Sequence, residues 1–227
     1  MLDNYRKAVI VMLMLWLALT AQMSLPVANV RGADIRGVFT ANDFPAYLQK
    51  AGASRTVYTR TTVRPDGTVQ GCVAEGKSGD PKLDAYTCGL IVRRAKFSPA
   101  LWTDGSPAYG IIRAPVNWVV TYHPQSYEQM LQSSIPDLEV TVSRLPAAAH
   151  QIAEAYVEVA ADESGHAVAC AEYQPTGKTV DEHRFPELVP IACDQVMKTY
   201  TVLPATDDSG KAVRSVQNVV VRFKLDH

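Results

Sequence analysis

The stretch from residue 83 to residue 107, LDAYTCGLIVRRAKFSPALWTDGSP, contains the signals that decide the fold. Lys82 to Ala95 fits a helix, and the loop Gly76 to Pro81 precedes it. Phe97 to Pro107 is rich in turn formers and connects this helix to a strand near Ala108 to Tyr122. A helix between strands predicts an α+β fold.

The residues before the helix predict a β-hairpin. Arg55 to Val63 is rich in Thr, Val and Tyr, which favour strands. Pro65-Asp66-Gly67 is a turn signal, and Thr68 to Ala74 resumes as a strand. The unit is therefore a hairpin, a helix and a last strand.

The cysteines indicate that this unit occurs twice. Cys72 and Cys170 each follow a glycine by five positions, and Cys88 and Cys193 each precede a Pro-Ala dipeptide by eleven. The offset is 98 residues for the first cysteine of each pair and 105 for the second, because the second copy has seven more residues between its cysteines. Such self-similarity predicts an internal repeat.

The second copy is predicted to repeat the elements of the first. Its hairpin strands are Ala155 to Ala161 and His166 to Tyr173, its helix is about Pro190 to Tyr200, and its last strand is Val213 to Leu225. The resulting boundaries are 1–32 for an N-terminal segment, 38–123 for the first repeat, 124–136 for a linker and 137–227 for the second repeat.

The N-terminal segment has the pattern of an export signal. Arg6 and Lys7 precede an apolar run of 14 residues, Ala8 to Ala21, without a charge. As a helix this run covers about 21 Å, short of the roughly 30 Å hydrocarbon core, which favours a cleaved signal. The alternative is an N-terminal anchor in the inner membrane. Either reading predicts a periplasmic location for the rest of the chain.

Export exposes all four cysteines to an oxidising compartment, where disulfides persist. Cys72 and Cys170 fall on the second strand of their hairpins, and Cys88 and Cys193 fall on the helices. The expected disulfides are Cys72–Cys88 and Cys170–Cys193. Each would link a helix to its sheet and stabilise the fold by about 3 kcal/mol in the chain-entropy model.

Several motifs of the first repeat resemble the C-terminal domain of the TonB family. They are, in order, Phe44-Pro45-Ala46, Leu83-Asp84, Phe97-Ser98-Pro99-Ala100 and Asp104-Gly105-Ser106-Pro107, and the resemblance covers about residues 43–120. In the second repeat, about residues 145–225, it is weaker and the sequence is divergent. Leu188, Pro204-Ala205 and Gly210 are kept, whereas Val189, Val202 and Ala212 replace the Asp, Phe and Pro of the first copy.

The resemblance implies a periplasmic domain of antiparallel strands with helices on one face. It also implies that the domain binds an extended segment of an outer-membrane receptor by strand addition and takes part in energy-coupled transmembrane transport. The sequence has only Pro26 between Ala21 and Asp43, where a transducer of this family needs a long Pro-rich spacer. We therefore expect the binding module without its mechanical arm.

The last strand of each repeat is the expected partner-binding edge. Its residues are Val116, Trp118 and Val120 in the first repeat and Val219, Val221 and Phe223 in the second. The partner would be an outer-membrane receptor or another extended peptide segment. The alternative hypothesis is a structural periplasmic protein whose two repeats cover each other's edges and which has no transport role.

No motif supports an enzyme, a cofactor or a metal. Residues 71–78, GCVAEGKS, have P-loop spacing, but a strand runs into the motif and Gly79-Asp80-Pro81 delays the helix. The five histidines lack ligand spacing, and G-x-S-x-G and C-x-x-C are absent. The 22 Lys+Arg against 23 Asp+Glu give a net charge of -1, which disfavours nucleic acid as a partner.

Two further groups are candidate contact residues. Arg93, Arg94 and Lys96 at the helix C-terminus complement the helix macrodipole, and a role in binding an acidic partner or an anionic membrane surface is the weaker interpretation. Trp102, in a loop, is a better candidate for an exposed binding anchor than Trp118, which is expected in the core.

Overall fold

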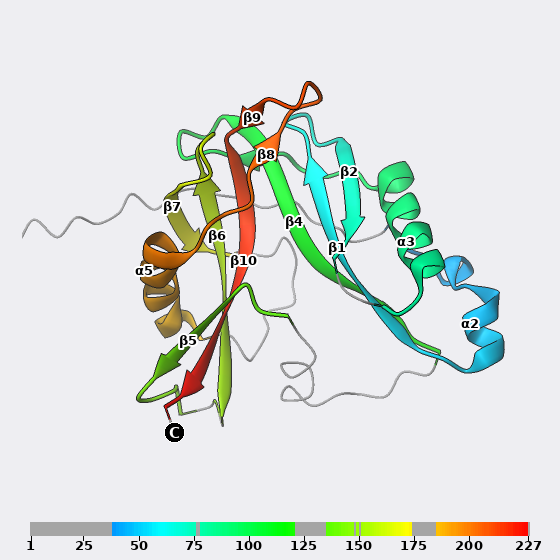
Figure 1. Cartoon of the computed structure of the whole chain (residues 1–227), viewed down its shortest axis with the longest axis horizontal. Coiled ribbons are helices and arrows are strands. Elements are labelled where there is room, and N and C mark those ends of the chain that lie inside the picture. Colours follow the sequence, from blue (N-terminus) through cyan, green and yellow to red (C-terminus); the bar gives the residue numbers. More distant parts are fainter. Residues whose placement is uncertain are drawn as a thin grey trace, which may run out of the picture.

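The computed structural model describes residues 38–75, 78–120, 135–147, 149, 151–173 and 185–226 (Figure 1). The expected export segment, 1–32, and residues 124–134 of the expected linker lie outside the described residues. Two halves of the described chain follow one another, and each contains a hairpin, a helix and a long last strand.

The first half begins with two short helices and continues with the hairpin and helix that the sequence predicts. Its elements are η1 (Ala41–Asp43), α2 (Ala46–Ala51), β1 (Arg55–Val63), β2 (Val69–Ala74), α3 (Pro81–Arg94), β3 (Ala100–Leu101) and β4 (Pro107–Trp118). β1 pairs antiparallel with both β2 and β4. β4 ends at Trp118, earlier than the expected Tyr122.

The second half has the same order with one additional strand at its start. Its elements are β5 (Leu138–Val142), β6 (Ile152–Ala161), β7 (Ala167–Glu172), η2 (Pro186–Leu188), α5 (Val189–Thr199), β8 (Ala205–Thr206), β9 (Ala212–Val213) and β10 (Ser215–Leu225). β6 pairs antiparallel with β7 and with β10. β5 pairs parallel with the end of β10 and was not predicted from the sequence.

One sheet runs through both halves. Its strand order is β2-β1-β4-β10-β6-β7. In addition, β3 pairs with β4 and β5 pairs with β10. The halves meet where β10 pairs parallel with β4, through Ser215–Gln217 and Tyr109–Ile111. The protein is therefore α+β with a large, mostly antiparallel sheet, which confirms the predicted fold class.

The two long helices cover opposite faces of this sheet (Figure 1). Ile112 and Val116 of β4 belong to the clusters that pack against α3, whereas Val219 and Val221 of β10 pack against α5. Gly110 of β4 is in register with Val216 of β10, so residues of equal parity share a face. The even positions of β4 therefore face α3 and the odd positions of β10 face α5.

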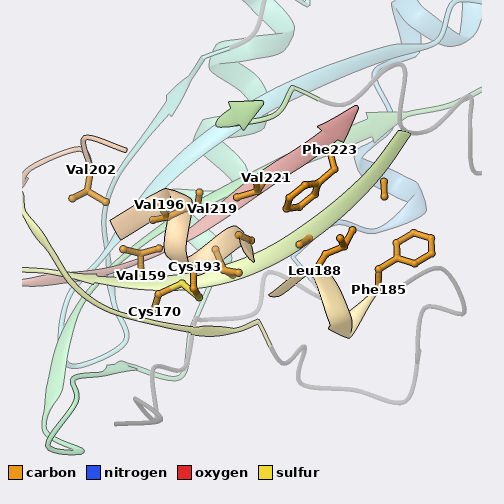
Figure 2. Close-up of a cluster of buried hydrophobic side chains, with 14 of the residues drawn as sticks. Val159, Cys170, Phe185, Leu188, Cys193, Val196, Val202, Val219, Val221 and Phe223 are labelled. Carbon is orange, nitrogen blue, oxygen red and sulfur yellow. A yellow bond between two sulfur atoms is a disulfide. The ribbon is translucent and has the colours of Figure 1, made fainter. Parts of the chain in front are cut away.

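Each helix buries one apolar core against its half of the sheet. In the second half, Phe223, Val221 and Val219 lie under Leu188, Cys193 and Val196, as Figure 2 shows. In the first half, Leu83, Leu90 and Ile91 of α3 are almost fully buried over the β1–β4 surface. Trp118 closes that core, with edge contacts to Phe39 and Phe44 and a 3.0 Å hydrogen bond from its indole N–H to Thr87 Oγ1.

Local signals explain the position of α3. The Asp80 carboxylate accepts hydrogen bonds from the N–H groups of Lys82 and Leu83 at 3.1 and 3.0 Å, and Pro81 occupies the first helical turn. The helix stops at Arg94, before the extended residue Ala95. Its start is therefore fixed by a side-chain cap that the sequence contains.

Both predicted disulfides are present. Cys72–Cys88 connects β2 to α3 across 16 positions, and Cys170–Cys193 connects β7 to α5 across 23. Each disulfide therefore fixes a helix to the second strand of its hairpin. Together the two bonds use all four cysteines of the sequence.

Gly67 provides a stability test with a matched control. Its φ is +84°, and an added Cβ would lie 2.1 Å from the backbone oxygen of Phe97. Gly165, the corresponding turn residue, has φ +81° but leaves 3.5 Å to the backbone oxygen of Val202. We expect Gly67→Ala to lower the free energy of unfolding by about 2–4 kcal/mol and Gly165→Ala by about 1 kcal/mol in urea unfolding. Equal losses would contradict this packing.

The segment before α2 is held by the carboxylate of Asp43. Its ion pair with Arg94 predicts that the stability of the protein falls in acid. Arg94 binds Asp43 with distances of 2.7 and 2.8 Å, and the Thr40 hydroxyl and N–H also donate to it. The hydrogen bonds from Arg94 and then Thr40 lower the pKa of Asp43 from 3.8 to about 2.

Because the folded-state pKa is lowered, this contribution to stability is complete above pH 4 and is lost as the pH falls through about 2. Asp43→Asn should therefore be less stable than the wild type at pH 5–7, and the difference in unfolding free energy should shrink toward pH 2. Thermal unfolding across this range measures it. A difference that stays constant with pH would contradict the assignment.

Candidate partner-binding edge

β4 is paired very differently along its two edges. One edge pairs with β1 through nine residue pairs, from Arg55↔Trp118 to Val63↔Gly110. The other edge pairs with β10 only from Tyr109 to Ile111. Beyond Ile111 the two strands diverge, as Figure 1 shows. Within the described chain, this second edge has no strand partner from Ile112 to Trp118.

Asn218 of β10 continues the pairing for one more residue. Its side-chain Oδ1 accepts a hydrogen bond from the Arg113 N–H at 2.8 Å, and its Nδ2 donates to the Arg113 carbonyl at 2.9 Å. One amide side chain therefore satisfies both backbone groups that a neighbouring strand would bind.

Asp137, directly before β5, binds both the backbone of β10 and the side chain of Arg113. Its carboxylate accepts from the Val220 N–H at 2.8 Å, and its own N–H donates to the Val220 carbonyl at 2.8 Å. The Arg113 guanidinium forms an ion pair with Asp137 and another with Glu75, at 2.7 Å. Arg113 is thus bound through its backbone by β10 and through its side chain by both halves of the protein.

The direction of the Arg113 backbone identifies the outward-facing groups of β4. Successive residues of a strand send their N–H and C=O groups to opposite edges. Because Arg113 faces Asn218, Pro115 and Asn117 also face the second edge, and Val116 and Trp118 face β1. Val120 agrees with this alternation, since its N–H donates to Ser54 Oγ at 3.2 Å, on the β1 side.

The structure therefore corrects the candidate edge in the first half. Val116 and Trp118 have buried side chains, 8% and 4% exposed, and their backbone groups pair with β1. Val120 is 38% exposed but also faces the β1 side. The groups available at the second edge are the Pro115 carbonyl and the N–H and carbonyl of Asn117. β4 therefore stays the proposed strand, but the residues whose backbone groups point outward differ by one position from those expected.

The candidate edge in the second half is corrected more fully. Val219, Val221 and Phe223 are at most 1% exposed, and they point into the core shown in Figure 2. β10 pairs with β6 along one side and with β4 and β5 along the other. It is an interior strand, because β5 occupies the edge that the sequence analysis left open.

Side-chain contacts also join the halves at the turn end of the sheet. Arg64 binds Asp208 at 2.8 and 3.0 Å, and Gln70 donates to the same carboxylate at 3.1 Å. Hydrogen bonds from Arg64 and Gln70 lower the pKa of Asp208. Burial raises the pKa of Tyr200, which lies near Arg113 and Glu75. Side-chain contacts therefore join the halves at the turn end of the sheet as well as at Arg113.

The remaining sequence candidates do not assemble into a second site. In the P-loop-like motif, Gly71 to Ala74 belong to β2, and α3 starts only at Pro81. Arg94 is bound by Asp43, whereas Arg93 and Lys96 are exposed. Trp102 is half-buried under Arg214, 5.2 Å from its ring centre.

Of the five histidines, only His166 belongs to the described residues, and it lies in the turn before β7. The described ranges contain no group of three or more metal-binding side chains.

The described residues form an α+β module with one disulfide in each half and one long strand, β4, that is paired along only part of its second edge. Residues 40–120 match the family model of the Gram-negative bacterial TonB protein C-terminal, and one copy is detected. No curated protein and no solved structure matches the chain. Across the part of the chain that the structure describes, no helix is long and apolar enough to cross a membrane.

Proposed function

We propose that this protein binds an extended segment of an outer-membrane receptor by adding that segment as a strand to the second edge of β4. The family match supports a TonB-like periplasmic protein linked to energy-coupled transport. The observation that carries the finer proposal is the edge beyond Ile111, where Asn117 presents both backbone groups outward and no described strand pairs with them.

The surroundings of Asn117 suit a peptide strand. Val119 and Val120, directly after β4, are 42% and 38% exposed and are adjacent in the chain. A strand added beside Asn117 would shield some of this apolar surface while its backbone makes the hydrogen bonds. Side chains in the partner would then matter mainly through apolar contacts near the end of β4.

We further propose that the second half is a divergent copy of the first that has become a scaffold. The same order of hairpin, helix and last strand, and the same helix-to-hairpin disulfide, support a common origin. Because β10 is flanked on both sides, this half presents no last-strand edge for a partner within the described residues.

A second candidate function has an observation in its favour. β10 pairs with β4, and Asn218 extends that contact, so the halves partly cover each other's edges. A structural periplasmic protein with self-paired repeats would show this arrangement. It differs from the first proposal in one respect: it requires no partner at Asn117.

Substitution of Asn117 separates these functions. Asn117→Pro removes the outward N–H, whereas Asn117→Ala keeps it and removes only the side chain, whose Oδ1 accepts from Thr56 at 2.8 Å. Labelled wild-type protein should show chemical-shift changes at Asn117 and Val119 on titration with peptides that cover the plug segment of an outer-membrane receptor. Asn117→Pro should weaken binding by about tenfold or more, and Asn117→Ala by about threefold at most.

Residues of β10 provide the internal control, because Val219 and Val221 should keep their shifts during the titration. Shift changes on β10 without changes at Asn117 would place the binding elsewhere. If no plug-segment peptide perturbs β4 at millimolar concentration, the self-paired structural function becomes the better account.

A further inference from the structure

Two residues interrupt the second edge of β4 between its contact with β10 and the open position at Asn117. Asn218 satisfies both backbone groups of Arg113, with distances of 2.8 and 2.9 Å. Pro115 follows as the next outward-facing residue, and a proline has no N–H to donate. Two successive outward positions are thus closed to a full strand pairing, by different chemistry.

The strand pairing between β1 and β4 accommodates Pro115 without interruption. Pro115 is in register with Tyr58 of β1, and the antiparallel pairing continues without a register shift on both sides of it. A proline can occupy a strand in this way only where its nitrogen faces the edge that makes no ladder bonds. This agrees with the direction that the Arg113 backbone gives independently.

We infer that Asn218 and Pro115 together form a strand stop that sets the register of a partner on β4. A partner strand can accept no bond from Arg113 or Pro115, so its pairing starts at the Pro115 carbonyl and continues through Asn117 toward Val119. The second half therefore contributes to where the partner binds, through one amide side chain. The part of this inference that concerns the partner rests on the proposed function.

The strand stop also limits unwanted pairing of β4 with other exposed strands. A long open edge invites pairing with any other exposed strand, and proteins shorten such edges with prolines and side-chain caps. Here the stop leaves few outward groups free in the described part of β4. A partner must therefore match a short, defined position instead of a uniform edge.

The first experiment needs no partner. Amide hydrogen exchange of Arg113 should be slow in the wild type, because Asn218 Oδ1 accepts its proton. Asn218→Ala should speed the exchange of Arg113 about tenfold or more, while Ile111, which pairs with β10, stays protected. Asn218→Asp is the second variant: it keeps an acceptor for the Arg113 N–H but loses the donor to the Arg113 carbonyl, so protection of that amide should fall less than in Asn218→Ala.

An Arg113 amide that stays protected in Asn218→Ala would overturn the role of Asn218. If Ile111 and Arg113 both lose protection, the substitution has opened the contact between β4 and β10, which would likewise contradict a cap confined to one residue.

The second experiment tests register and uses Pro115, whose side chain is exposed and whose replacement is tolerated by a strand. Pro115→Ala adds one outward N–H. It should tighten binding of the plug-segment peptide about two- to tenfold, and the new amide at position 115 should gain exchange protection only when the peptide is present. Pro107→Ala, eight positions earlier at the start of β4 and on the far side of the contact with β10, should leave the affinity for the peptide unchanged.

The outcomes distinguish the register assignment from the proposed function. If the wild type binds the peptide at Asn117 but the amide that Pro115→Ala introduces stays unprotected in the complex, the register assignment is wrong and the proposed function stands. If no peptide binds any variant, the proposed function fails, and exchange of Arg113 still decides whether Asn218 caps the strand.

Discussion

The attachment of Arg113 determines how the two halves of the protein are joined. Its backbone is bound by Asn218 and its guanidinium by Asp137 and Glu75, so one residue of β4 holds β10, the start of β5 and the end of β2. The parallel contact beside it involves three residue pairs. Without Arg113, β4 and β10 would be joined near this point by that short contact alone, and the opening that leaves Asn117 free would lose its fixed geometry.

Sequence reasoning succeeded wherever the deciding signals are close together in the chain. The turn at Pro65-Asp66-Gly67 and the loop Gly76 to Pro81 act within a few residues, so β1, β2 and α3 were predicted nearly to the residue. The disulfides followed because a repeated spacing places each cysteine pair on a hairpin strand and a helix. These features depend on local backbone preferences, which a single sequence records.

The residues expected at the partner-binding edge differ from the outward-facing ones for the opposite reason. Whether β10 is an edge depends on β5, which lies more than 80 positions earlier and pairs through Val221↔Leu138. On β4 the sequence pattern favours apolar residues as the edge, but Val116 and Trp118 are apolar because their side chains fill the core. The outward backbone groups belong to Pro115 and Asn117, and the contact between Arg113 and Asn218 reveals their direction. The proline agrees with that direction, but which edge of β4 lacks a partner depends on pairings with strands far away in the sequence.

The unequal lengths of the two contacts of β4 have a mechanical consequence. A partner pulled along β4 would load the nine-pair ladder with β1 in shear, where many hydrogen bonds resist together, and the Cys72–Cys88 bond anchors the hairpin behind it. The three-pair contact with β10 has far fewer bonds to share the same load. In shear, the contact with β10 is therefore the weaker of the two strand pairings of β4.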